Sequence, residues 1–194
     1  VAHEDWLTTF AAIAGDTVIW KPSPKAPLCA IAVQNICNRV MQQQGYAGIF
    51  SLFITDQTNV AELMVQDTRL PLISFTGSVP VGRRVASVVA QRLGRTLLEL
   101  SGNNAVIVDD TADLDMAVRA VLFGAIGTAG QRCTTTRRLF VHESRYEQLT
   151  GKLVKAYAQV RIGNPLDQDV LLGPLIDQAA VESYRAALDE DARA

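Results

Sequence analysis

The stretch Leu72-Ile73-Ser74-Phe75-Thr76-Gly77-Ser78 decides the fold class, because it reads as a strand that stops at a Gly-Ser turn. Apolar residues over 72–75 predict the strand, and a helical pattern follows over about 81–93. A second strand is predicted over 96–100. This order of strand, helix and strand predicts two parallel strands joined by a helical crossover.

The same alternation extends along the whole chain. Gly15 and Gly45 are expected to close the helices before them, and the strand over 17–20 is expected to be buried. We therefore expect an α/β fold of mostly parallel sheets with helical crossovers. Further helices are predicted over 6–14, 28–40, 60–65, 114–122 and 145–160, and further strands over 49–54, 105–108 and 138–142.

Composition limits the class of protein. The chain has 194 residues and is 48% hydrophobic, enough for a real core, and its net charge of −2 gives no reason to expect nucleic acid or an anionic membrane as a partner. No apolar run approaches the roughly 20 residues of a membrane span, and no stretch reads as a signal peptide. Cys29, Cys37 and Cys133 lack paired metal-type spacing. We expect reduced thiols in a cytoplasmic protein, with Cys29 and Cys37 in the core.

The turn at Gly77-Ser78 lies between a strand and a helix, where free N–H groups and the Ser78 hydroxyl favour an anion. It is not the G-x-G-x-x-G fingerprint of dinucleotide-binding folds. On spacing alone, a turn with a purely structural role is at least as frequent as one that binds phosphate.

Cys133 and Glu99 form the second candidate site. Cys133 lies in Gly130-Gln131-Arg132-Cys133, where small neighbours let a carbonyl approach the sulfur. Glu99 ends an apolar run in which partial burial would raise its pKa toward that of a general base. Without further evidence, a cysteine among small residues is more often an unreactive packing residue than a nucleophile. A glutamate after an apolar run is usually only the last residue of a strand.

Several blocks of this sequence resemble aldehyde dehydrogenases. Two segments are most similar to the α-aminoadipic semialdehyde dehydrogenase (antiquitin) branch of that superfamily. The first is residues 127–140, and the second is LLEL (97–100) together with the Asn103-Asn104-Ala105 that follows it. The blocks are GDTVIWKPS (15–23), FTGS (75–78) with Val81-Gly82, LLEL (97–100), GQRC (130–133), and GNPLD (163–167) followed by LGPL (172–175).

The resemblance implies a role for each block. Cys133 would attack the aldehyde, and Glu99 would activate the water that hydrolyses the resulting thioester. NAD, or alternatively NADP, would be the cofactor, and a small-molecule aldehyde the substrate. The implied cofactor-binding residues are Lys21, Gly77, Ser78, Gly82 and Leu100, and the implied substrate-binding residues are Arg132 and Thr134.

The resemblance also implies the domain organisation. Residues 1–100 would be part of a Rossmann-like NAD(P)-binding domain, and residues 101–194 part of the catalytic domain. The chain would be an internal portion of a longer enzyme, itself a homo-oligomer.

Departures from the family pattern fall at four positions. Leu7 stands where relatives carry an Asn oxyanion donor, and the loss of one such donor costs about 10²–10³ in rate. Pro24 replaces a ribose-binding Glu, Ala61 a Gly near the adenine, and Ser101 a Gly beside the nicotinamide.

These departures leave alternatives open. The chain could be a catalytically inactive nucleotide-binding or remnant fragment, in which turnover is impaired. It could instead be a thiol hydrolase acting through Cys133 and Glu99, or a truncated product that does not fold stably alone.

Overall fold

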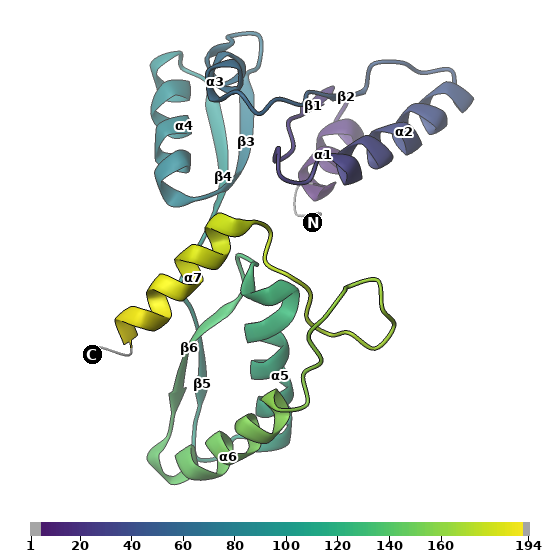
Figure 1. Ribbon diagram of the computed structural model, residues 1–194. Helices are drawn as coiled ribbons and strands as arrows, with labels where there is room; N and C mark the ends of the chain where they lie inside the picture. The colour runs from purple at the N-terminus through teal and green to yellow at the C-terminus, as the bar shows by residue number, and fades with distance from the viewer. Residues whose placement is uncertain (1–4, 192–194) are drawn as a thin grey trace. The chain divides into compact units, whose positions relative to one another are not determined.

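The computed structural model describes the backbone of residues 5–191 and the side chains of residues 8–190. The chain divides into two compact units, Val1–Leu100 and Ser101–Ala194. Each unit is built from parallel strand pairs with helical connections, which confirms the expected α/β fold (Figure 1).

The first unit contains two parallel strand pairs. The first is β1 with β2, in which Val18 pairs with Phe50, and the second is β3 with β4, in which Leu72 pairs with Arg95. In chain order the elements are α1 (Asp5–Ile13), β1 (Val18–Trp20), α2 (Pro27–Gln43), β2 (Phe50–Leu52), α3 (Thr58–Gln66), β3 (Leu72–Gly77), α4 (Val79–Gln91) and β4 (Arg95–Leu100).

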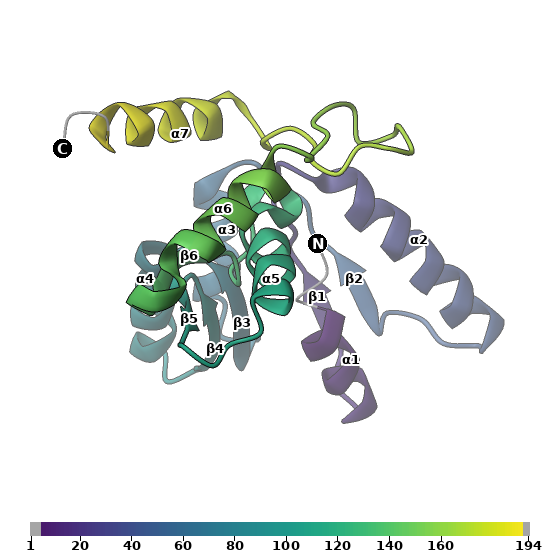
Figure 2. The same cartoon turned by 90° about the horizontal axis from the view of Figure 1, so that it is seen from below.

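The second unit contains one parallel pair, β5 with β6, and helices α5 and α6 lie side by side next to it (Figures 1 and 2). Its elements are β5 (Asn104–Val108), α5 (Leu114–Ile126), η1 (Gly127–Gly130), β6 (Thr136–Val141), η2 (Glu143–Arg145), α6 (Tyr146–Tyr157) and α7 (Gln178–Asp191).

Local chemistry explains where these elements begin and end. Asp113 caps α5, because its carboxylate accepts hydrogen bonds from the backbone N–H groups of Asp115 (2.9 Å) and Met116 (3.1 Å). Gly15 and Gly45 follow α1 and α2 with φ values of 91° and 75°, a region that glycine enters without steric cost. The predicted positions of these two helix ends are therefore confirmed.

Each unit has its own small core. In the first, Ile73 of β3 packs against Val85 and Val89 of α4. In the second, Val108 of β5 packs against Leu114 of α5 and Leu149 of α6. These clusters fix α4 on one face of β3–β4 and fix α5 and α6 against β5–β6.

Much of the remaining apolar surface is exposed. The apolar stripe of α2 illustrates this, because Leu28 is 77% exposed and Ile36 is 52% exposed.

Three expectations about burial are wrong for this reason. Cys29 is exposed and Cys37 is half-buried, so neither is a core residue. The strand over 17–20 is not buried either, since Ile19 in its middle is exposed. A two-stranded sheet covered by one helix layer has too little surface to bury both of its own faces and every helix stripe.

No helix in the described part of the chain is long and apolar enough to cross a membrane.

Candidate active site

The carboxyl ends of β3 and β4 bring together four of the residues expected to bind the cofactor. Gly77 ends β3 and is the register partner of Leu100, which ends β4. Ser78 follows Gly77 and precedes α4, and Gly82 lies buried in the first turns of that helix. Ligands of parallel α/β sheets bind outside the carboxyl ends of the strands, and these four residues lie at that edge. Their cofactor-binding roles stay predictions.

Both glycines lie in close contact with neighbouring side chains. A Cβ atom on Gly77 would stand 2.7 Å from Cζ of Phe75, and one on Gly82 would overlap Cδ2 of Leu100. The absence of these Cβ atoms lets the Leu100 side chain lie against α4 and keeps the turn before the helix open.

The turn has the features that a phosphate requires. Ser78 is extended, with φ −75° and ψ 150°, and its hydroxyl does not cap α4. The hydroxyl oxygen of Thr76 is buried and has no hydrogen-bond partner among the described residues. At the start of α4 the free N–H donors are those of Val79 and Val81, because Pro80 between them has no N–H. These residues therefore fit the pyrophosphate of a dinucleotide.

Lys21 follows the carboxyl end of β1, in the other strand pair of the first unit. Its side chain is half-buried, and its Nζ donates a hydrogen bond to the carbonyl oxygen of Pro22 at 3.0 Å. The role of Lys21 at a ribose stays a prediction.

Glu99 is exposed, so the expected partial burial of this carboxylate is wrong. Side chains of β4 alternate between its two faces, and Leu98 and Leu100 are half-buried on the face next to α4. Glu99 points to the other face, and among the described residues α4 is the helix with extensive contacts to β4. Its register partner is Thr76, which places it at the same strand ends as the Gly-Ser turn.

The backbone shortly before Cys133 has an unusual conformation. Thr128, Ala129 and Gly130 have φ values of 56°, 54° and 71°, so three consecutive residues are left-handed. Only the glycine adopts this conformation without cost, and a β-branched residue such as Thr128 is a clear outlier there. Backbone strain of this kind clusters at functional sites.

Cys133 itself is exposed at the centre of a tight turn. The N–H of Thr135 donates to the carbonyl oxygen of Arg132 at 3.1 Å, which makes Cys133 and Thr134 the two central residues. The Arg132 N–H in turn donates to Oγ1 of Thr135 at 3.1 Å. Thr135 is a buried polar residue, only 4% exposed, and its side chain closes the turn from inside.

Arg132 is engaged by its own loop. Its Nη2 donates to the carbonyl oxygen of Phe123 at 2.7 Å, and its guanidinium lies 4.6 Å from the centre of the Phe123 ring. It pairs with no carboxylate among the described residues. Thr134 is exposed beside the sulfur. The substrate-binding roles of both residues stay predictions.

Two residues that hold the cysteine loop have no signal in the local sequence. Asn104 donates from Nδ2 to the carbonyl oxygens of Cys133 (2.6 Å) and Thr135 (3.1 Å). Gln131 accepts a hydrogen bond at Oε1 from the Ile176 N–H at 2.9 Å, which ties the later segment to this loop. Their partners lie 29 and 45 residues away in the chain, beyond the reach of any local pattern.

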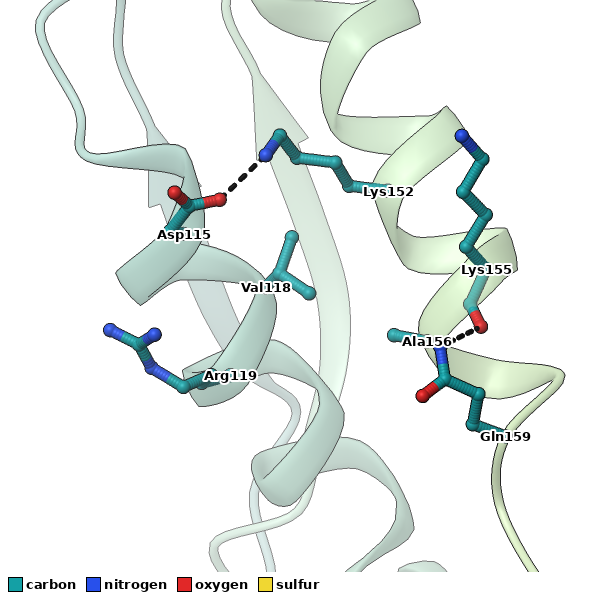
Figure 3. Close-up of a pocket in the computed structure, with 7 residues that line it drawn as sticks. All are labelled: Asp115, Val118, Arg119, Lys152, Lys155, Ala156 and Gln159. Carbon is teal, nitrogen blue, oxygen red and sulfur yellow. Dashed lines mark hydrogen bonds and ion pairs between the residues drawn. The ribbon is translucent and has the colours of Figure 1, made fainter.

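A shallow pocket of about 290 Å³ lies between α5 and α6, and none of the predicted site residues line it (Figure 3). Lys152 and Asp115 form an ion pair across it at 2.6 Å. The hydrogen bond from Lys152 lowers the pKa of Asp115 below its ordinary value. The pocket is a solvated groove between two packed helices, separate from the cysteine loop.

Cys133 belongs to the second unit and Glu99 to the first. Their pairing as nucleophile and base stays a prediction, as do the NAD(P)-binding and catalytic roles of the two units. The side chains of Trp6 and Leu7 lie outside the described residues, so the position of the expected oxyanion donor is known from the sequence alone.

Residues 5–194 match the aldehyde dehydrogenase family, and the chain belongs to that family. This confirms the family predicted from the sequence blocks.

The most similar relatives lie in one branch of that family. The chain is 46% identical over 180 residues to aldehyde dehydrogenase family 7 member A1 of Pisum sativum, covering 93% of this chain and 35% of that protein. It is 44% identical over 190 residues to alpha-aminoadipic semialdehyde dehydrogenase of Bos taurus, covering 98% and 35%. The chain therefore spans about a third of the length of these relatives.

A solved structure supports the same fold. Betaine aldehyde dehydrogenase of Staphylococcus aureus, in complex with NAD+ and with a BME-modified cysteine, is 28% identical, with a TM-score of 0.81. The match covers 89% of this chain and 34% of that one.

Proposed function

We propose that this protein oxidises a small-molecule aldehyde to a carboxylate, with NAD or NADP as the hydride acceptor and Cys133 as the nucleophile. The observation that carries the proposal is the exposed Cys133 at the centre of a hydrogen-bonded turn, preceded by three left-handed residues. An ordinary packing cysteine is buried and needs no strained approach.

The residues would act in sequence. The Cys133 thiolate attacks the aldehyde carbon and forms a thiohemiacetal, which becomes a thioester when hydride leaves. NAD(P), when bound, supplies the acceptor for that hydride. Glu99 takes a proton from the water that hydrolyses the thioester, and the thiolate of Cys133 is released with the carboxylate product.

The cofactor would lie at the carboxyl ends of β3 and β4. Ser78 and the first N–H groups of α4 would hold its pyrophosphate, and Gly82 and Leu100 would pack beneath it. Lys21 would reach the adenosine ribose. Pro24 and Ala61 replace residues that relatives use at the ribose and adenine, so NAD and NADP both remain candidates.

The proposed substrate is α-aminoadipic semialdehyde. The support is similarity to a relative with that activity in its name, at 44% identity. A cytoplasmic location and a homo-oligomeric assembly are also proposals.

A second function is favoured by one observation. Leu7 has no hydrogen-bond donor at the position where relatives carry an oxyanion-stabilising Asn. This departure favours a nucleotide-binding protein that does not turn over.

The test measures absorbance at the NADH band, with the purified chain, NAD and α-aminoadipic semialdehyde, and then repeats it with NADP. Turnover that disappears in Cys133→Ala supports the dehydrogenase. Cys29→Ala is the matched control, since Cys29 is also an exposed free thiol and should leave the rate unchanged. Calorimetry with NAD and with NADP separates the second function from the first. Binding of either nucleotide without turnover supports the nucleotide-binding protein, and binding of neither contradicts both proposals.

A further inference from the structure

Asn104 is the first residue of β5, and its side-chain amide reaches the cysteine turn. Nδ2 donates to the carbonyl oxygen of Cys133 at 2.6 Å and to that of Thr135 at 3.1 Å. A carboxamide nitrogen carries two hydrogens, so both bonds can be made at the same time. The amide therefore acts as a two-point clamp on one short stretch of backbone.

The clamp lies where the strand pairing is irregular. Asn104 pairs with Thr136, but the next residue, Ala105, pairs with Arg138, so β6 carries one extra residue at this point. Such a bulge interrupts the ladder of backbone hydrogen bonds. The Asn104 side chain supplies hydrogen bonds to carbonyl groups just before β6 begins, where the ladder itself provides none.

The turn is thus held from two sides. From inside, Thr135 and Arg132 close it through the bonds between their backbones and the Thr135 hydroxyl. From outside, Asn104 holds the carbonyl group that follows the Cα of Cys133. Fixing that carbonyl restricts rotation about the bond between Cα and C of Cys133, and so restricts the direction in which the sulfur points.

We propose that Asn104 is a positioning residue for the nucleophile: its amide holds the backbone of Cys133 so that the sulfur faces the aldehyde carbon. The inference rests on the proposed function, because it assigns Asn104 a part in the attack by Cys133. Asn104 would act through the backbone carbonyl groups of Cys133 and Thr135, to which its amide is bonded. Misplacement of a reacting atom by about 1 Å can cost about 100-fold in rate.

A simpler role would be to terminate β5. The two roles differ in what loosens when the amide is removed. If the amide serves to end the strand, its removal should loosen the β5–β6 pairing at Val106 and Leu139. If it clamps the turn, its removal should loosen residues 132–135 alone. The neighbouring Asn103 provides a matched control, since it is exposed and only its backbone carbonyl is used, by Arg138 at 2.7 Å.

The experiment compares Asn104→Ala, Asn104→Asp and Asn103→Ala with the unchanged chain by hydrogen exchange and steady-state kinetics. At neutral pH the Asp variant keeps the shape of the side chain but has no donor. We expect exchange of the Arg132 and Thr135 amides, which are hydrogen-bonded within the turn, to rise about tenfold in both Asn104 variants, with β5 and β6 unchanged. We expect kcat to fall about 10- to 100-fold, with KM for the cofactor unchanged. Asn103→Ala should match the unchanged chain in both measurements.

Each outcome decides the inference. Equal exchange over 132–135 in all chains, exchange that rises in the β5–β6 pairing instead, or an Asn104→Asp variant with full kcat would overturn it. Exchange needs no substrate, so the two proposals can fail separately. If exchange responds as expected in a chain without turnover, the hold on Cys133 stands and the dehydrogenase proposal fails.

Discussion

Gly127 is the position at which a single methyl group tests how the cysteine loop is held. A Cβ atom there would overlap Nη2 of Arg132 and stand 2.6 Å from its Cζ. Gly127→Ala therefore displaces the guanidinium from both the carbonyl and the ring of Phe123. The backbone is not the obstacle, since φ −52° and ψ 127° suit alanine as well as glycine.

The magnitude follows from the two lost interactions. A hydrogen bond from a charged donor contributes about 1.5–3 kcal/mol, and a cation–π contact at an exposed ring about 0.5–1 kcal/mol. Replacing glycine by alanine returns about 0.4–1 kcal/mol by restricting the unfolded chain. We expect a net destabilisation of the second unit by about 1–3.5 kcal/mol, which lowers its Tm by about 4–28 °C.

The assay is thermal unfolding followed by far-ultraviolet circular dichroism. Trp6 and Trp20 both lie in the first unit, so tryptophan fluorescence reports that unit alone and should not change. Gly151→Ala is the matched control within α6, because a Cβ atom there meets nothing within 4 Å. The free energy of unfolding of that variant should rise by about 1 kcal/mol, because alanine favours the helix more than glycine does.

The same substitution is thus expected to have opposite signs at two positions of one unit. If Gly127→Ala unfolds at the same temperature as the unchanged chain, Arg132 is not held by Phe123, and the described packing of the loop is wrong. If both variants are destabilised, the loss is a general effect of alanine and not of the Arg132 contact.

Two further predictions concern each unit separately. Leu149→Ala should lower the free energy of unfolding by about 3 kcal/mol, since Leu149 is 1% exposed and packs between β5 and α5. Val154→Ala on the same helix is the control: Val154 is 64% exposed, so the free energy of unfolding measured in urea should change by less than about 0.5 kcal/mol. Equal losses would contradict the described core. Hydrogen bonds from the Arg69 side chain and backbone lower the pKa of Asp67 to about 2. The stabilisation from this pair is present above the ordinary pKa of 3.8 and is lost as the pH falls through about 2. Arg69→Ala should bring the pKa back toward 3.8, measured by NMR titration of the carboxyl carbon, and an unchanged pKa would show that the pair does not form in solution.

The kinds of element could be predicted because their signals are local. Periodicity over one helix or strand, together with turns at Gly15 and Gly45, placed every strand and most helices within a few residues of their observed bounds. The Gly-Ser turn was predictable for the same reason, since the strand, Gly77, Ser78 and the helix are consecutive in the chain.

Burial could not be predicted, because it depends on which remote segments cover a face. The apolar pattern of α2 is the same whether its stripe is buried or open, yet Leu28 and Cys29 are exposed. Glu99 follows an apolar run, but its side chain is exposed.

The sequence by itself determined the family, the order of strands and helices, and the identity of the candidate nucleophile, since each depends on neighbouring residues. The tertiary structure alone decided how that nucleophile is held. The left-handed backbone at Thr128 and Ala129 opposes the preference of both residues, and such a conformation persists only where surrounding contacts impose it. The Asn104 clamp joins segments 29 residues apart, and only the pairing of β5 with β6 brings them within hydrogen-bonding distance.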